Sequence, residues 1–166
     1  NKPTQCHFID IQHGLTDYIN TESIQVNPVN FHVTLGFLGS IGQSVIPLLI
    51  NCITKMKKSQ FELSLSELQF WQKPKIICMT GHAQPNLLTM AETVQNIAQQ
   101  LKLHQSQYPY QPHVTLFRKA NSLNLEHNIS VLHNMLPINL SPTEFHLYRS
   151  INIGKGVEYQ IIHSWA

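Results

Sequence analysis

The sequence FHVTL at residues 31–35 recurs as PHVTL at residues 112–116. In a β-strand, successive side chains point to opposite faces, so the histidine and the threonine of each copy would share one face. The valine and leucine of each copy would lie on the opposite, buried face. The side chains that two such strands would present together are His32, Thr34, His113 and Thr115.

The composition bounds the class of protein. The chain has 166 residues, of which 42% are hydrophobic, and we expect one domain over residues 1–166. A formal charge of +2 excludes a strongly basic nucleic-acid coat and limits any RNA contact to a small local surface. Three cysteines without paired spacing favour reduced thiols and a cytoplasmic protein. No apolar run approaches the roughly 20 residues that span a bilayer, and no signal-peptide pattern is present, so we expect no membrane contact.

The spacing of apolar residues predicts the other elements. Strands are expected at residues 6–11, 31–37, 61–65, 75–80, 112–116, 144–150 and 157–164, with residues 68–71 extending or following the third of these. Helices are expected at residues 43–58 and from residue 85 or 86 to residue 103. Residues 12–30 have weak periodicity, and an irregular stretch follows the second motif as far as residue 142.

The order strand, helix, strand occurs in both halves of the chain, with one copy of the motif in each half. This order predicts an α+β fold with two pseudo-symmetric lobes, each a small, mostly antiparallel sheet backed by helices. The two motif strands would face each other, and the active site would lie in the cleft between the lobes.

The residue types in the motifs suit proton transfer beside a phosphate group. Imidazoles titrate near neutrality and can donate or accept a proton. Threonine hydroxyls and the forked guanidinium of Arg118 can donate hydrogen bonds to phosphate oxygens. Taken singly, a motif histidine could be structural, a threonine a mere strand former, and Arg118 a surface cation. Two converging histidines could also bind zinc, but catalytic zinc takes three protein ligands and no third is evident, so no metal is expected.

The segments FHVTLGFLG at residues 31–39 and PHVTLFR at residues 112–118 resemble the paired signatures of the two-histidine (2H) phosphoesterases. The dipeptide FW at residues 70–71 and the segment TEFHLY at residues 143–148 are similar in order and spacing to one branch of these enzymes. That branch contains the RNA 2',3'-cyclic phosphodiesterases, also called 2'-5' RNA ligases. The resemblance covers nearly the whole chain.

The resemblance implies opening of 2',3'-cyclic phosphates at RNA ends to 2'-phosphates, without metal or cofactor, and reversible 2'-5' RNA ligation as a side activity. It implies that His32 is the acid that protonates the 3' oxygen and that His113 is the base that takes a proton from water. Thr34, Thr115 and Arg118 would bind the phosphate. The expected partners are RNA ends or oligonucleotides that carry a 2',3'-cyclic phosphate, and the expected state is a monomer.

Two other functions stay open. The same site could act on 2'-5' oligoadenylate or another nucleotide-derived phosphodiester, because residues outside the motifs set the substrate. The chain could also be a catalytically silent module that binds RNA ends. The sequence around the remaining histidines is not repeated, and these residues are expected on the surface or in the core. Packing, more than base stacking, is the favoured role for each of Trp71, Tyr108, Tyr110, Tyr148 and Trp165.

Overall fold

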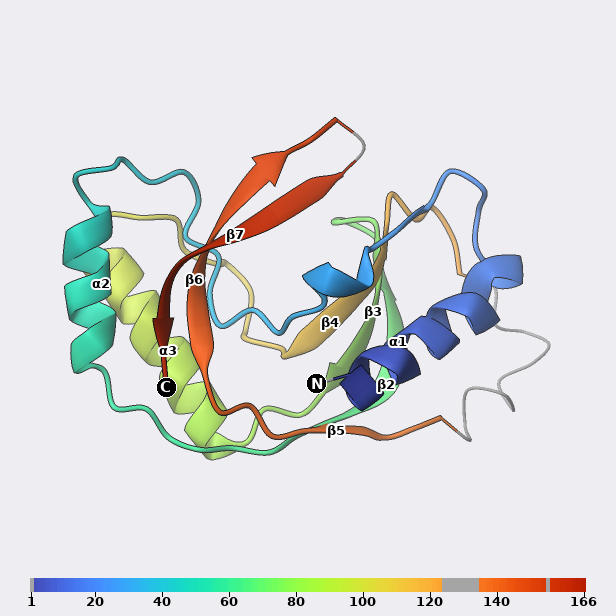
Figure 1. Cartoon of the computed structure of the whole chain (residues 1–166), viewed down its shortest axis with the longest axis horizontal. Helices are drawn as coiled ribbons and strands as arrows, with labels where there is room; N and C mark the ends of the chain where they lie inside the picture. Colours follow the sequence, from blue (N-terminus) through green and yellow to red (C-terminus); the bar gives the residue numbers. More distant parts are fainter. Residues whose placement is uncertain (1, 124–134, 155) are drawn as a thin grey trace. The chain divides into compact units, whose positions relative to one another are not determined.

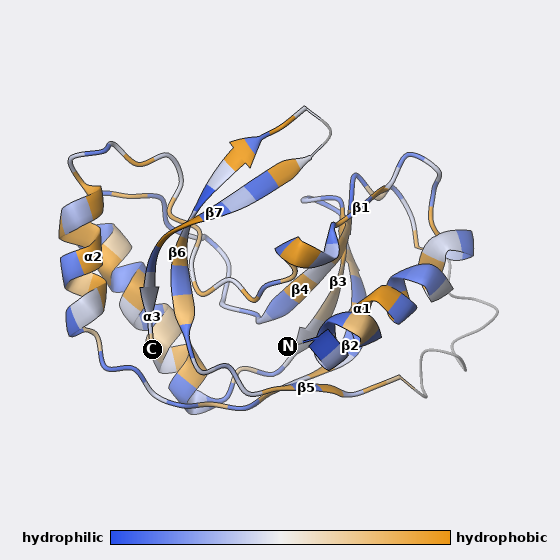
Figure 2. Ribbon diagram, in the orientation of Figure 1, coloured by the Kyte–Doolittle hydropathy of each residue, from blue (hydrophilic) through white to orange (hydrophobic). Residues whose placement is uncertain are grey.

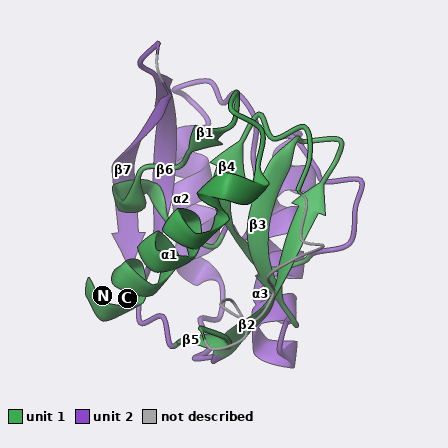
Figure 3. Ribbon diagram, turned by 90° about the vertical axis from the view of Figure 1, so that its right-hand side faces the viewer, with its two compact units in different colours: residues 1–33, 63–82, 111–140 green, residues 34–62, 83–110, 141–166 purple. Residues whose placement is uncertain are grey.

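Three separate stretches of the chain build each of the two units of this computed structural model, which describes residues 2–123, 135–154 and 156–166. The first unit consists of residues 1–33, 63–82 and 111–140, and the second consists of residues 34–62, 83–110 and 141–166 (Figure 3). The predicted mixture of helices and antiparallel sheets is confirmed. The units differ from the expected halves of the chain, however, and both motif histidines belong to the first unit.

The first unit contains a five-stranded sheet in the order β1-β4-β3-β2-β5, in which every pair of neighbours is antiparallel (Figure 1). Its strands are β1 (Ile24–Gln25), β2 (Leu63–Trp71), β3 (Ile76–Gly81), β4 (His113–Arg118) and β5 (Ile138–Leu140). The strands predicted at residues 61–65, 75–80 and 112–116 are therefore confirmed. Strand β5 lies in the stretch predicted to be irregular, and residues 124–134 of that stretch lie outside the described residues.

Helix α1 (Lys2–Leu15) occupies the segment in which we predicted a strand at residues 6–11, so that prediction is wrong. Phe8, Ile11 and Leu15 are buried at the spacing of one helical face. Figure 2 shows hydrophobic and hydrophilic residues alternating around α1. The weakly patterned stretch after it forms two short 3-10 helices, η1 (Thr16–Tyr18) and η2 (Pro28–Asn30), together with β1.

Residues 31–38 form no strand, so the strand predicted for the first motif is also wrong. The 3-10 helix η2 ends directly before this segment, where the Phe31 amide donates to the carbonyl of Pro28 over 3.2 Å. The chain then passes from the first unit to the second between Val33 and Thr34. The first motif therefore leaves the sheet instead of joining it.

The second unit contains two helices and a two-stranded antiparallel sheet, and all four elements confirm their predictions within a few residues. They are α2 (Ile46–Lys55), α3 (Pro85–Gln100), β6 (Phe145–Asn152) and β7 (Val157–Trp165). Both helices have a proline in the first turn, where its missing N–H costs no hydrogen bond. Their buried cluster contains Leu49, Ile53, Met56, Met90, Val94, Ile97, Leu147 and Trp165. Among the described residues, no helix is long and apolar enough to cross a membrane.

Gly81 ends β3 at a point where the backbone of β2 comes close. A Cβ atom at this position would clash with the backbone carbonyl of Ser64. We therefore expect Gly81→Ala to lower the free energy of unfolding by about 1–3 kcal/mol, measured by denaturant titration. Gly14→Ala is the control, because Gly14 lies in α1 with open space around it, and alanine there should stabilise the helix by up to about 1 kcal/mol. An unchanged unfolding midpoint in Gly81→Ala would contradict the predicted clash.

Candidate active site

The two motif histidines make the same local hydrogen bond. Nδ1 of His32 lies 2.6 Å from the carbonyl oxygen of Asn30, and Nδ1 of His113 lies 2.9 Å from that of Gln111. A carbonyl oxygen only accepts hydrogen bonds, so each Nδ1 carries the hydrogen. In both rings Nε2 is therefore the atom that loses or gains a proton near neutral pH.

His32, His113 and Arg118 act on one another electrostatically within the first unit. Burial is the largest cause that lowers the pKa of His32, and the positive charge of Arg118 lowers it further, against the opposing hydrogen bond to Asn30. For His113 too, burial is the largest cause that lowers the pKa; the hydrogen bond to Gln111 opposes it, and the charges of His32 and Arg118 lower the pKa further. The three side chains are therefore close enough for the charge on one to change the protonation of another.

A β-bulge in β4 changes which face its last residues occupy. Cys78 on β3 pairs with Thr115, but the preceding residue of β3, Ile77, pairs with Phe117. Leu116 is therefore the extra residue of the bulge, without a partner on β3. Bulges of this kind redirect the side chains that follow them, and they are common next to active sites.

The bulge brings Arg118 to the face of the sheet that carries His113 and Thr115. Leu116 and Phe117 are both buried, at 0% and 3% exposure, so two consecutive residues occupy the opposite face. Strict alternation would have placed Arg118 away from His113. The sequence contains no recognisable signal for this extra residue, and most of the support for Arg118 in the sequence comes from the family resemblance.

Trp71 contacts His113 directly. The centroids of the two rings are 4.6 Å apart, with an angle of 57° between the ring planes. Nε1 of Trp71 donates to Oε1 of Gln69 over 2.8 Å, and Nε2 of Gln111 lies 3.5 Å from the same oxygen. The sequence favoured packing for Trp71 but did not indicate its partner. Gln69 was not singled out from the sequence. Its spacing of two residues from Trp71 on one strand places both side chains on the same face, and this spacing is the signal that could have found it.

The predicted site residues divide between the two units. His32, His113, Thr115 and Arg118 belong to the first unit, whereas Thr34 belongs to the second. Across residues 2–123, 135–154 and 156–166, no three His, Cys, Asp or Glu side chains form a group that could hold a metal ion. The arrangement supplies two imidazoles, a hydroxyl and a guanidinium, which can transfer protons and bind an anion.

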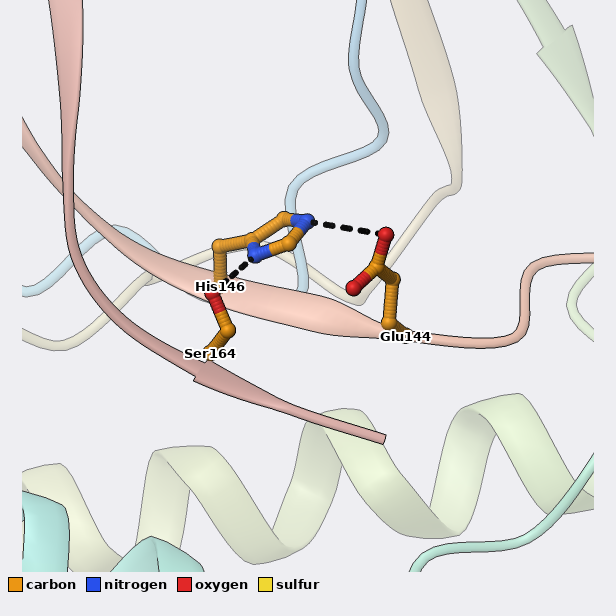
Figure 4. A network of polar contacts seen from close by, with 3 residues as sticks. All are labelled: Glu144, His146 and Ser164. Atoms are coloured by element: carbon orange, nitrogen blue, oxygen red, sulfur yellow. Dashed lines mark hydrogen bonds and ion pairs between the residues drawn. The ribbon is translucent and has the colours of Figure 1, made fainter.

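A second polar cluster lies on the β6–β7 sheet (Figure 4). Nδ1 of His146 lies 2.8 Å from Oγ of Ser164, its cross-strand neighbour. Nε2 of His146 lies 3.9 Å from a carboxylate oxygen of Glu144, which is beyond hydrogen-bonding distance, and the Glu144 side chain is 58% exposed. This cluster stabilises the pairing of β6 and β7.

Comparison with known proteins identifies the family. The model of the 2'-5' RNA ligase superfamily matches residues 14–153. The chain is 26% identical to the RNA 2',3'-cyclic phosphodiesterase of Escherichia coli strain K12 over 139 residues, which are 82% of this chain and 76% of that protein. It is 23% identical to the protein of the same name from Aeropyrum pernix over 145 residues, which are 83% of this chain and 82% of that protein.

Solved structures share the fold. The structure of E. coli LigT complexed with NADP+ matches with a TM-score of 0.79 at 22% identity, and the match covers 99% of this chain and 91% of the LigT chain. The structure of LigT complexed with 3'-AMP matches with a TM-score of 0.77 at 24% identity, and the match covers 97% of this chain and 91% of the LigT chain. With a family model that matches most of its length, the chain belongs to the 2'-5' RNA ligase superfamily of 2H phosphoesterases.

Proposed function

We propose that the chain hydrolyses RNA 2',3'-cyclic phosphate ends to 2'-phosphates, without a metal or cofactor, as a monomeric domain over residues 1–166. The observation that carries this proposal is the electrostatic coupling of His32, His113 and Arg118, with the same Nδ1 hydrogen bond in both histidines. Two relatives named RNA 2',3'-cyclic phosphodiesterase support the substrate class. The LigT complexes with 3'-AMP and ATP support a nucleotide ligand.

In the proposed reaction, Nε2 of neutral His113 takes a proton from water as the water oxygen attacks phosphorus. The bond between phosphorus and the 3' oxygen breaks, and Nε2–H of charged His32 protonates that oxygen. The product is a 2'-phosphate beside a 3'-hydroxyl. Exchange of protons with solvent returns the pair to its starting state.

The other predicted residues would bind the phosphate. Thr34, Thr115 and Arg118 would donate hydrogen bonds to the non-bridging oxygens, where negative charge increases in the transition state. If the 5'-hydroxyl of a second RNA replaces water, the same proton transfers form a 2'-5' phosphodiester. This step is reversible, because one phosphodiester replaces another.

The substrate test uses the purified chain with three compounds: RNA that ends in a 2',3'-cyclic phosphate, a 2'-5' linked dinucleotide, and 2'-5' oligoadenylate. We expect the cyclic end to be opened fastest and phosphorus NMR to identify the product as a 2'-phosphate. Faster cleavage of 2'-5' oligoadenylate would favour the alternative substrate. Tight binding of cyclic-ended RNA without turnover would favour a silent binding module, and either result would contradict the proposal.

We expect chelation to leave turnover unchanged. Both proton transfers are assigned to imidazoles, so no bound metal is needed to activate water. The measurement compares the initial rate before and after dialysis against EDTA, with a zinc-dependent phosphodiesterase treated in parallel as the control. Loss of activity that zinc restores would show that a metal takes part.

A further inference from the structure

Gln12 is a polar side chain on the buried face of α1, and its exposure is 0%. All of its polar atoms have partners. Nε2 donates to the carbonyl oxygens of Val26 over 2.9 Å and Leu116 over 2.8 Å. Oε1 accepts a hydrogen bond from Nε2 of Gln25 over 2.9 Å. A side chain that is buried and fully paired in this way fixes the backbone groups that it contacts.

One of those backbone groups belongs to the β-bulge. Leu116 is the residue of β4 that has no partner on β3, and it is fully buried. An unpaired carbonyl in such a position destabilises the fold, so the bulge requires hydrogen-bond donors from elsewhere. The Leu116 carbonyl accepts from two, Nε2 of Gln12 and the amide of Val26, which lies 2.8 Å away.

We propose that Gln12 is a positioning residue for Arg118: its amide holds the bulge at Leu116, and the bulge keeps the guanidinium on the face of His113. A strand without the extra residue would place every later side chain on the opposite face. Arg118 would then point away from the two imidazoles. The inference rests on the proposed function in one respect, because the proposed function assigns Arg118 to phosphate binding.

The test measures the pKa of His113 without any substrate, by NMR titration of the imidazole C–H signals. The charge of Arg118 lowers this pKa, so movement of Arg118 away from His113 raises it. Gln12→Met removes the amide and keeps the length of the side chain. We expect it to raise the pKa of His113 toward the value found in Arg118→Gln.

A double variant that combines Gln12→Met with Arg118→Gln tests whether Gln12 acts through Arg118. Other groups near His113 are unchanged in every variant: His32, whose charge lowers the same pKa, Glu67 of β2 and Cys78 of β3. We therefore expect Gln12→Met to cause no further rise in the Arg118→Gln background. An unchanged pKa in the single variant would overturn the proposal. A rise of equal size in both backgrounds would also overturn it, because Gln12 would then act by another route.

Two variants separate positioning from stability. Leu15→Ala removes a buried side chain from the same face of α1 but keeps the Gln12 amide, and we expect it to lower Tm but leave the pKa of His113 unchanged. If Gln12→Met does not fold, Gln25→Ala decides, because this exposed residue donates to Oε1 of Gln12. A smaller rise in the same direction would support the proposal, and no rise would contradict it.

The kinetic test distinguishes this inference from the proposed function. With cyclic-ended RNA, we expect Gln12→Met to lower kcat/KM by about tenfold, the scale of one charge-assisted hydrogen bond. In the Arg118→Gln background it should cause no further loss. A wild-type chain that is inactive on this RNA would contradict the proposed function, whereas the pKa titration would still test Gln12.

Discussion

His113→Ala and His32→Ala will each lower kcat on cyclic-ended RNA by at least about 100-fold, the usual loss when a general acid or base is removed. In the proposed reaction each imidazole has a separate task, because one proton is taken from water and another is given to the 3' oxygen. Arg118 and Thr115 would still bind the phosphate in both variants. We therefore expect KM to stay close to that of the unchanged protein.

Steady-state kinetics on folded variants, checked by circular dichroism, measures this effect. His13→Ala is a matched control, because His13 is exposed in the last turn of α1 and lies outside both motifs. Its kcat and KM should not change. A folded variant of His32 or His113 that keeps near-normal turnover would rule out the proposed two-histidine mechanism.

The pH dependence of kcat/KM will be bell-shaped, with the rate falling about tenfold per pH unit on each side. In the proposed mechanism His113 starts neutral and His32 starts charged, so the productive pair would carry one proton. Burial and the charge of Arg118 lower the pKa of both rings, so the bell for the unliganded enzyme should centre below 6.5. The two apparent pKa values of the profile belong to the pair of histidines and not to one residue each, because the rings interact.

Substrate should move the bell to higher pH. A bound phosphate anion stabilises the charged form of each imidazole, so the pKa values rise in the complex and the kcat profile should lie within about pH 5 to 8.5. Arg118→Gln should shift the bell-shaped kcat/KM profile to higher pH, because it removes a charge that lowers both pKa values. A rate that keeps rising past about pH 9 without a plateau would indicate hydroxide or metal-bound water as the nucleophile.

Sequence periodicity predicted the elements whose buried residues keep a regular spacing. In α3, Leu87, Met90, Ala91 and Val94 are buried at steps of three and four residues, as predicted. In α1, the polar residue Gln12 interrupts the apolar face, and the short segment at residues 6–11 was therefore mistaken for a strand. Residue patterns could not reveal that Gln12 is buried, because its hydrogen-bond partners come from distant parts of the chain.

The repeated motif predicted His32 and His113 as site residues, but it did not predict how they are held. One motif forms a strand and the other follows a 3-10 helix, although their sequences are nearly the same. Tertiary context decided this difference, because His113 has β3 beside it and residues 31–38 leave the sheet. The bulge that orients Arg118 depends on pairing across strands, which local spacing does not encode.

Synthesis on the ribosome exposes the first unit in an incomplete form, because its segments alternate with those of the second. Strands β2 and β3 can pair as a hairpin as soon as residue 81 has emerged. The other edge of β3, which is wholly buried from Ile76 to Thr80 in the finished fold, must then wait for residues 113–118. An apolar strand with an unpaired edge is prone to aggregate. We therefore expect nascent chains halted between these two points to need chaperones more than chains halted after residue 140.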